Sequence, residues 1–387
     1  MVYQPQIVII GAGIVGLSTA YALLTEGNFR VRVLEQAFVS HPKSTSSSIS
    51  RLLRFEYGVD AFYSRMVKLS LERWRDLEWR TQRALYTPTG LLSLGREEDE
   101  TVREQETVRS LGLASERLSA QKCRQRFPQF ETRNYQFLTY NPDGGILHAS
   151  ACLNTLKRAV LDLGGEIAET SHVTQILHES SSRPLRLRLS SGEEINADRA
   201  VVATGPWVHR LLSPLHIPVE VTRQYLLYFA GLPASTFGVG IFPAFVEHDL
   251  YGFPIHKGSN GWLKAASHRF GRPVDPDAPL QIEEAIVEQT ARELRALLPA
   301  LRGAELAHVE TCMYDVSPDE DFILDYLPGD SRIVFATGLS GHGFKFGPLL
   351  GHLLGSLISE TLPEVPLGRF RLARFSRQHT RQTISVA

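Results

Sequence analysis

Cysteine is scarce in this chain of 387 residues, which contains only Cys123, Cys152 and Cys312. Three scattered cysteines do not make a disulfide framework, and their spacing matches no zinc-binding pattern. We therefore expect no metal site and a reducing compartment. Because an isolated cysteine is usually a small buried hydrophobe, this count alone assigns none of them a chemical role.

Long apolar runs and an excess of charge of one sign are also missing. No run reaches the ~20 residues needed to span a bilayer, and 41 Lys plus Arg balance 42 Asp plus Glu. Such a balance creates no overall field that attracts nucleic acid or an anionic membrane. Residues 1–6 contain no basic segment followed by an apolar core, so we expect no leader peptide and a cytoplasmic protein without nucleic-acid or membrane partners.

What the chain does contain, at its start, is the pattern of a dinucleotide-binding turn. An apolar strand at residues 7–10 leads into Gly11, Gly13 and Gly16, and a helix follows through Leu24. In this fold the first glycine makes the tight turn, the second lets backbone amides approach a pyrophosphate, and the third lets helix and strand pack closely. The pattern predicts a nucleotide site that also includes Ile14 and Val15.

An acidic residue stands where this fold needs one. Glu35 closes a second strand at residues 31–34 and follows Gly16 by 19 positions. Its carboxylate can accept hydrogen bonds from a ribose diol and would repel a ribose phosphate, which disfavours NADP. The motif does not separate NAD from FAD.

The rest of the chain alternates between two kinds of region. Apolar strands run into Ala-Thr-Gly at residues 199–205 and again at 332–338, as expected of central strands that reach a cofactor, here through Thr204 and Gly205. The intervening regions are rich in short strands and aromatic residues. We predict an α/β protein (α+β overall) with a Rossmann-like nucleotide-binding domain of residues 1–85, 145–215 and 306–387, and an interleaved, mostly antiparallel β-sheet substrate domain of residues 86–144 and 216–305.

Three helices have recognisable start signals. Asp60 is a predicted N-cap for a long amphipathic helix, and Ser150 for a helix whose inward face would include Leu153 and Leu163. Pro348 suits the first turn of a helix that follows a glycine-rich loop. The positive end of that last helix can stabilise negative charge.

Several cations are candidates for chemistry. Arg51 and Arg54 follow a loop rich in serine and threonine, and the guanidinium fork matches a carboxylate or phosphate. Lys264 lies among apolar neighbours in a predicted strand. Strand alternation can point its side chain inward, where burying the charge costs free energy unless the residue has a function, or outward into water. The pattern leaves both orientations open. Lys345 and His342 lie among the glycines of residues 340–347.

At these residues the chain resembles the amine-oxidising FAD flavoproteins around monomeric sarcosine oxidase and N-methyltryptophan oxidase, relatives of D-amino-acid oxidase. The similarity runs over nearly the full length in the same order. It includes the N-terminal glycines, Ser50-Arg51-Leu-Leu-Arg54 before Tyr57-Gly58, Leu263-Lys264 before His268, Cys312-Met-Tyr with Pro318-Asp-Glu, and Ser340-Gly-His-Gly-Phe-Lys345.

The resemblance implies a function and a role for each matching residue. A secondary amino acid would be oxidised to an imine, and oxygen would be reduced to hydrogen peroxide. Cys312 would bond covalently to the flavin, Arg54 and Lys345 would hold the substrate carboxylate, and Lys264 would activate oxygen. Tyr251, His268 and Tyr314 would line the substrate side. The expected cofactor residues are Gly11, Gly13, Ile14, Val15, Gly16, Glu35, Ser50, Arg51, Thr204, Gly205, Cys312, Gly341, His342, Gly343, Phe344 and Lys345.

Two departures from the family pattern leave the amine open. Ser46-Ser47-Ser48 replaces histidines of the bacterial sarcosine oxidases, and Asp315 replaces a common threonine. A bulkier or cyclic substrate, such as a pipecolate-like amino acid, is therefore kept beside sarcosine. A dehydrogenase that passes electrons to a quinone or a protein, and a non-catalytic flavin-binding sensor, are the alternatives. We expect a monomer.

Overall fold

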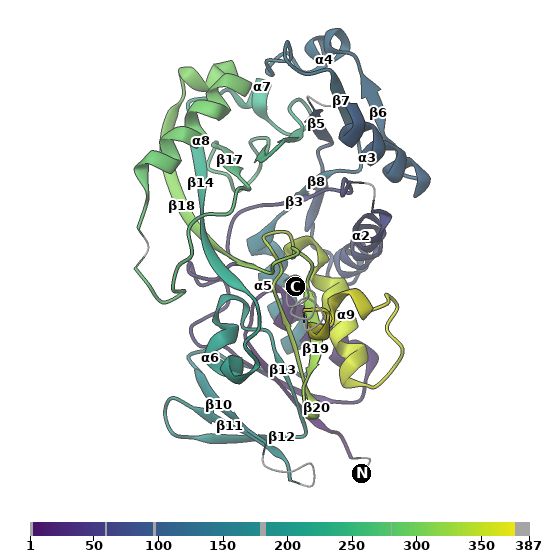
Figure 1. Cartoon of the computed structure of the whole chain (residues 1–387), viewed down its shortest axis with the longest axis vertical. Helices are drawn as coiled ribbons and strands as arrows, with labels where there is room; N and C mark the ends of the chain where they lie inside the picture. Colours follow the sequence, from purple (N-terminus) through teal and green to yellow (C-terminus); the bar gives the residue numbers. More distant parts are fainter. Residues whose placement is uncertain (1–2, 59, 96–97, 179–182, 280, 376–387) are drawn as a thin grey trace, which may run out of the picture.

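The computed structural model describes residues 3–58, 60–95, 98–178, 183–279 and 281–375. Its lower half in Figure 1 is built on a six-stranded sheet. In spatial order the strands are β19 (Ile323–Leu327), β20 (Asp330–Thr337), β13 (Arg199–Val202), β1 (Gln6–Ile10), β2 (Arg30–Leu34) and β9 (Glu166–Ala168). Neighbouring strands are parallel except for β19 and β20, so the carboxyl ends of the parallel strands share one edge.

Side chains of β1 alternate between two hydrophobic cores. Ile7 and Ile9 face one core, and Val8 and Ile10 face the other. The first core contains the helices α1 (Ile14–Glu26), α2 (Ala61–Thr81), α5 (Ala149–Asp162) and α9 (Gly347–Ile358). The second contains α6 (Val208–Leu212) and a separate sheet of β10 (Val173–Leu177), β11 (Leu185–Leu189) and β12 (Glu194–Ala197). The central strands are therefore buried on both faces.

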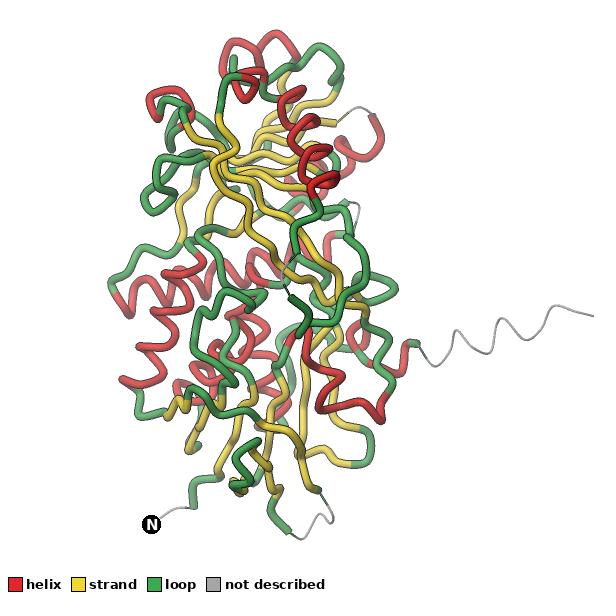
Figure 2. Tube along the Cα trace, turned by 90° about the vertical axis from the view of Figure 1, so that its left-hand side faces the viewer, coloured by secondary structure: helices red, strands yellow, loops and turns green. Residues whose placement is uncertain are grey.

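The upper half is built on an eight-stranded sheet (Figures 1 and 2). Its order is β18 (Glu305–Val316), β14 (Glu220–Ala230), β17 (Leu263–Ser267), β16 (Leu250–Gly252), β15 (Ala244–Glu247), β5 (Leu91–Gly95), β7 (Phe137–Asn141) and β6 (Glu116–Leu118). Only β15 and β5 pair in parallel. Helix α8 (Glu284–Leu297) packs on one face of this sheet, where it meets Leu227 and Ala265. The next residues along the same two strands, Tyr228 and Ala266, belong to a separate hydrophobic cluster.

Shorter elements complete the fold. A small sheet of β3 (Arg51–Leu53), β8 (Gly145–Leu147) and β4 (Tyr86–Pro88) brings together segments that are distant in sequence. The described residues also form the α-helices α3 (Glu98–Ser110), α4 (Ala120–Arg126) and α7 (Ala234–Phe237). No helix in the described part of the chain is both long enough and apolar enough to cross a bilayer.

The predicted architecture of a Rossmann-like sheet with an interleaved antiparallel sheet is confirmed. The domain boundaries stay a prediction, and residues 376–387 of the predicted first domain lie outside the described residues. Strand β18 pairs with β14 from the Glu220–Val316 pair to the Ala230–Glu305 pair. Cys312 therefore stands on the eight-stranded sheet, although the predicted boundary assigned it to the nucleotide domain.

The start signals of two helices are confirmed, and one is wrong. Asp60 caps α2 by accepting a hydrogen bond from the Phe62 amide, and Pro348 lies in the first turn of α9. Helix α5, in contrast, has His148 at its N-cap, and the Ser150 hydroxyl donates to the carbonyl of Ser48 over 2.7 Å. Leu163, predicted to face inward, is 44% exposed because the helix ends before it.

Candidate active site

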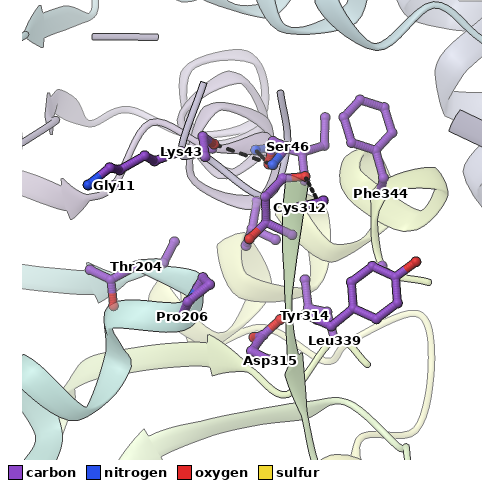
Figure 3. Close-up of a pocket in the computed structure, with 18 of the residues that line it drawn as sticks. Gly11, Lys43, Ser46, Thr204, Pro206, Cys312, Tyr314, Asp315, Leu339 and Phe344 are labelled. Carbon is purple, nitrogen blue, oxygen red and sulfur yellow. Dashed lines mark hydrogen bonds between the residues drawn. The ribbon is translucent and has the colours of Figure 1, made fainter. Parts of the chain in front are cut away.

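A cavity of about 450 Å³ is lined by residues of both large sheets and of the loops between them. In the view of Figure 3, Gly11 and Thr204 lie at one side, Phe344 and Tyr314 at the other, and Cys312 and Ser46 between them. Cavities of a few hundred cubic ångströms that combine apolar walls with a few polar groups are typical of cofactor and small-molecule sites.

The glycine-rich turn forms one end of the cavity. Gly11 has a φ of +102°, and a Cβ atom there would lie 2.4 Å from the carbonyl oxygen of Ala203. A Cβ atom on Gly16 would lie 1.9 Å from the carbonyl oxygen of Gly11. Helix α1 starts beside the cavity with no side-chain hydrogen bond from its N-cap, Gly13. Its positive end, apart from the Ile14 amide that donates to the Ser46 hydroxyl, is therefore available to an anion such as a pyrophosphate.

Glu35 is fixed at the edge of the same cavity. One carboxylate oxygen accepts a hydrogen bond of 2.8 Å from the Ala12 amide, and the other accepts one of 3.0 Å from the Ala37 amide. Because a carboxylate oxygen has two lone pairs, each oxygen can accept a further hydrogen bond from a ligand hydroxyl.

Arg51 organises the serine-rich loop. Its guanidinium donates to the carbonyl oxygens of Thr45 at 2.7 Å, Ser47 at 3.0 Å and Ser50 at 3.1 Å. It also lies 5.7 Å from the centre of the Phe344 ring. The loop in turn contributes Ser46, whose hydroxyl accepts from the Ile14 amide at the start of α1.

Lys264 lies next to the cavity but does not line it. Its side chain is 2% exposed, and its Nζ donates to Ser48 Oγ over 2.6 Å and to the Ser50 carbonyl over 2.9 Å. Burial, reinforced by Arg51, holds the pKa of Lys264 well below its usual value, and Glu310 and Cys312 act in the opposite direction. The alternation of β17 thus points Lys264 inward, which the sequence left open.

The opposite end of the cavity holds two cations close to one tyrosine. Lys345 Nζ donates to the Tyr57 hydroxyl over 2.6 Å and to the His342 carbonyl over 2.8 Å. The Arg54 guanidinium lies 4.8 Å from the centre of the Tyr57 ring and donates to the Glu56 carbonyl over 2.7 Å. Burial and the neighbouring Arg54 lower the pKa of Lys345 well below its usual value.

Three predicted substrate-side residues also line this part of the cavity, namely Tyr251, His268 and Tyr314. Nδ1 of His268 lies 3.4 Å from the hydroxyl of Tyr314. Burial, together with Arg54 and Lys345, lowers the pKa of His268 to about 4. His268 is therefore neutral near pH 7.

Cys312 faces the middle of the cavity from β18. Its Sγ lies 3.8 Å from the Thr45 carbonyl oxygen. Burial raises the pKa of the thiol, whereas Arg51 and Lys264 act to lower it. Asp315, on the same strand, also lines the cavity and accepts a hydrogen bond of 2.8 Å from the Gly338 amide.

The structure thus brings most of the predicted site residues to one cavity. Three of them do not line the cavity, namely Gly16, Ser50 and Lys264. Sequence reasoning missed Tyr57 and Ser48, which hold Lys345 and Lys264. Their signals were weak, since Tyr57 stood out only beside Arg54 and Ser48 only as one of several serines. No cluster of potential metal ligands occurs among the described residues.

Comparison with known proteins identifies the family. Residues 6–357 match the family described as FAD-dependent oxidoreductases. The chain belongs to this family. It is 32% identical to the human peroxisomal sarcosine oxidase over 381 residues, which cover 95% of each chain. It is 29% identical to the N-methyl-L-tryptophan oxidase of Salmonella arizonae over 382 residues, which cover 96% of this chain and 99% of the relative.

A solved structure shows the same fold. The L-proline dehydrogenase of P. horikoshii superposes with a TM-score of 0.86 at 20% identity, covering 98% of this chain and 99% of that one. The residues present fit the cofactor of the FAD-dependent family, because the cavity joins the start of α1 and Glu35 to a compartment lined by Cys312 and the two cations. The chain is therefore an FAD-dependent oxidoreductase.

Proposed function

We propose that this protein oxidises a secondary amino acid, N-methylated or cyclic, to an imine and passes the electrons to oxygen, which leaves as hydrogen peroxide. The observation that carries this proposal is the pair of cations, Arg54 and Lys345, in the cavity that also begins at the glycine-rich turn. Two fixed cations suit a substrate carboxylate. The names of the two curated relatives, oxidases of sarcosine and of N-methyl-L-tryptophan, support an N-substituted substrate.

In this proposal FAD lies along the cavity. The start of α1 would hold the pyrophosphate, Glu35 the ribose, and Arg51, Phe344 and Cys312 would surround the flavin. When bound, FAD supplies the two-electron redox chemistry, and the protein supplies orientation and charge. We also propose a covalent bond between the cofactor and Cys312, which the position of its Sγ in the cavity wall supports.

The chain's own residues would prepare the substrate. Arg54 and Lys345 would hold the carboxylate, which orients the amine relative to Tyr251, Tyr314 and His268. A neutral His268 can accept a hydrogen bond from the substrate amine. Asp315 and the serines at positions 46–48 stand where the sarcosine oxidases differ, so the same site would accept a bulkier or cyclic amine.

Lys264 would act in the second half of the reaction. A positive charge beside the cofactor stabilises the negative charge that develops on oxygen in a site with little water. Among the described residues its hydrogen-bond partners are Ser48 and Ser50, so one N–H of the ammonium remains for that purpose. Lys264→Met should leave anaerobic flavin reduction in place and slow reoxidation by orders of magnitude, and unchanged reoxidation would remove Lys264 from this role.

The proposal also covers the protein's setting. The three cysteines are unpaired, which supports a reducing compartment such as the cytoplasm, although the human relative is named as peroxisomal. A monomer is also part of the proposal.

An anaerobic substrate screen tests the function. N-methyl, cyclic and primary amino acids are mixed with the holoenzyme, and bleaching of the flavin absorption is followed. Secondary amino acids should bleach it fastest, and one molecule of peroxide should form per molecule oxidised in air. Bleaching without peroxide, but with reduction of a dye, would indicate a dehydrogenase, and absence of bleaching with any compound would contradict the proposal.

A matched pair of variants tests the carboxylate site. Arg54→Met should raise the KM by about two orders of magnitude, because a charge-assisted contact contributes roughly 1.5–3 kcal/mol. Arg65→Met removes an arginine from an exposed position of α2 and should leave the KM unchanged. Equal KM values in the two variants would remove Arg54 from this role.

A further inference from the structure

Lys264 is connected to the protein surface by a row of side chains that the oxidation of an amino acid does not require. Its Nζ donates to Ser48 Oγ over 2.6 Å. The Ser48 hydroxyl lies near enough to the Tyr228 hydroxyl to act as a donor that lowers the pKa of Tyr228, against the larger effect of burial, which raises it. That hydroxyl donates to Oε2 of Glu310 over 2.5 Å. Strands β17, β14 and β18 contribute the lysine, the tyrosine and the glutamate, so neighbouring strands of one sheet hold the row in place.

The two ends of this row differ in their access to water. Lys264 and Tyr228 are each 2% exposed and Ser48 is 8% exposed, whereas the side chain of Glu310 is 36% exposed. His308, itself half exposed, lies 4.0 Å from the other oxygen of Glu310. A buried amine is thus linked through two buried hydroxyls to a carboxylate at the surface.

We propose that Ser48, Tyr228 and Glu310 form a proton relay that restores the proton of Lys264 during each turnover. This inference rests on the proposed function, in which oxygen becomes hydrogen peroxide beside Lys264. That conversion takes two electrons and one proton from the reduced cofactor and a second proton from the protein. One proton leaves Nζ of Lys264 for the reduced oxygen. A proton from the solvent binds the Glu310 carboxylate and passes to the Tyr228 oxygen, while Tyr228 gives its own proton to Ser48 and Ser48 gives its own to the neutral Nζ.

The chemistry of the groups supports this direction of flow, although the hydroxyls must turn once Lys264 has lost its proton, because at rest Lys264 donates to Ser48 and Tyr228 donates to Glu310. Burial makes the ammonium of Lys264 a better acid than a surface lysine, so it can give up a proton to the reduced oxygen. A hydroxyl can both donate and accept a hydrogen bond. Ser48 and Tyr228 can therefore each receive one proton while giving up another, and both are neutral before and after the transfer. The charged and titratable groups that act on the pKa of Lys264 are Arg51, Glu310 and Cys312, and Lys264 in turn lowers the pKa of the nearby His256.

Two variants interrupt the relay in different ways. Tyr228→Phe removes one hydroxyl and no charge, and Glu310→Gln removes the surface acid. Glu305→Gln is the matched control, because Glu305 is an exposed glutamate at the first position of β18. Glu310→Asp keeps the acid and should restore the function.

The first measurement separates the two halves of the reaction. The holoenzyme is reduced anaerobically by substrate and then mixed with oxygen, in H2O and in D2O. Flavin reduction should stay within about twofold of the parent protein. In Tyr228→Phe and Glu310→Gln, reoxidation should slow about tenfold, and the solvent isotope effect should rise from near 1 to about 2 or more, because proton supply becomes limiting. The Glu305→Gln and Glu310→Asp variants should behave like the parent.

The second measurement needs no turnover. The absorption spectrum of the oxidised flavin is titrated with pH, and the midpoint that Lys264→Met abolishes belongs to Lys264. Glu310→Gln should lower this midpoint by about half a unit or more, since a nearby negative charge is lost, and Tyr228→Phe should leave it close to the parent value.

The outcomes are distinct from those of the proposed function. If no amino acid reduces the parent flavin, or if oxygen does not reoxidise it, the proposed function fails while the titration still tests the link between Lys264 and Glu310. Normal reoxidation with an unchanged isotope effect in both Tyr228→Phe and Glu310→Gln would overturn the relay. An equal loss of flavin reduction and reoxidation would also overturn it, because it would indicate a structural role.

Discussion

The ammonium group of Lys345 donates a hydrogen bond of 2.6 Å to the hydroxyl of Tyr57, which precedes it by 288 positions in the chain. Lys345 precedes α9 and Tyr57 precedes α2, and these two helices share the core below the cavity. The contact fixes a buried cation at the edge of the cavity, close to Arg54. The position of Lys345 therefore depends on how the two helices pack.

Tyr57→Phe should make the position of the Lys345 ammonium group less well fixed. Lys345 would keep only its bond to the His342 carbonyl, and a lost hydrogen bond to a charged group costs roughly 1.5–3 kcal/mol. We expect the KM for the amino acid to rise by about tenfold and kcat to change by less than about threefold, as measured by steady-state kinetics. Tyr63→Phe is the control, since the Tyr63 hydroxyl pairs with Asp321. An unchanged KM in Tyr57→Phe would show that Tyr57 does not position Lys345.

Cys312→Ser should release the flavin when the protein is denatured. The thiol is the atom of this residue proposed to bond the cofactor, and a hydroxyl is a far weaker nucleophile. The parent protein precipitated with acid should give a yellow pellet, and the variant a colourless pellet with free FAD in solution. Cys123→Ala removes a cysteine from the core of the other domain and should stay yellow. A colourless pellet from the parent would contradict the covalent link.

Asp315 should make stability depend on pH. Burial raises its pKa to about 6, even though the Gly338 amide and the Thr337 hydroxyl stabilise the carboxylate. The folded state therefore binds the proton more tightly than the unfolded chain, in which the pKa is near 3.8. This stabilisation is fully present below pH ~4 and is lost as the pH rises through ~6, a change on the order of 3 kcal/mol.

Asp315→Asn keeps the shape and removes the titration. Urea unfolding of both proteins between pH 4 and 7.5 should show the parent losing stability relative to the variant as the pH rises. Asp319→Asn is a control in which the pH dependence should run the other way. Burial alone would raise the pKa of Asp319, but the hydrogen bond from Arg374 lowers it overall, so the Asp319 carboxylate stabilises the fold at higher pH. A constant difference between the parent and Asp315→Asn over this range would contradict the prediction.

Two glycines of α9 should respond oppositely to a methyl group. A Cβ atom on Gly351 would lie 2.3 Å from the backbone carbon of Ser18 in α1, whereas one on Gly355 would meet its nearest atom, Ala22 Cβ, at 3.8 Å. Gly351→Ala should lower the free energy of unfolding by about 2 kcal/mol or more, because both helix backbones must move apart. Gly355→Ala should raise it by up to about 1 kcal/mol. Thermal unfolding measures both, and equal effects would contradict this packing.

Much of the fold could be predicted because its signals are local. The strand at residues 7–10, the three glycines that follow and the acidic residue at position 35 lie within 29 consecutive residues, and each has a backbone or packing reason to be there. The helix that starts after Asp60 and the one that contains Pro348 were predicted for the same reason. Ser150 shows the limit of such signals, since its hydroxyl bonds Ser48 instead of capping the helix.

The sequence by itself determined the cofactor-binding fold, the family and the identity of the main cations, because glycine turns and short motifs act over a few residues. Only the tertiary structure decided that Lys264 points inward and bonds Ser48, that Tyr57 holds Lys345, and that Asp315 is buried beside Gly338. In a strand the direction of a side chain follows from which sheet or helix packs on each face. Those partners come from segments far away in the chain, and only their packing determines which charges are buried and which hydrogen bonds they make.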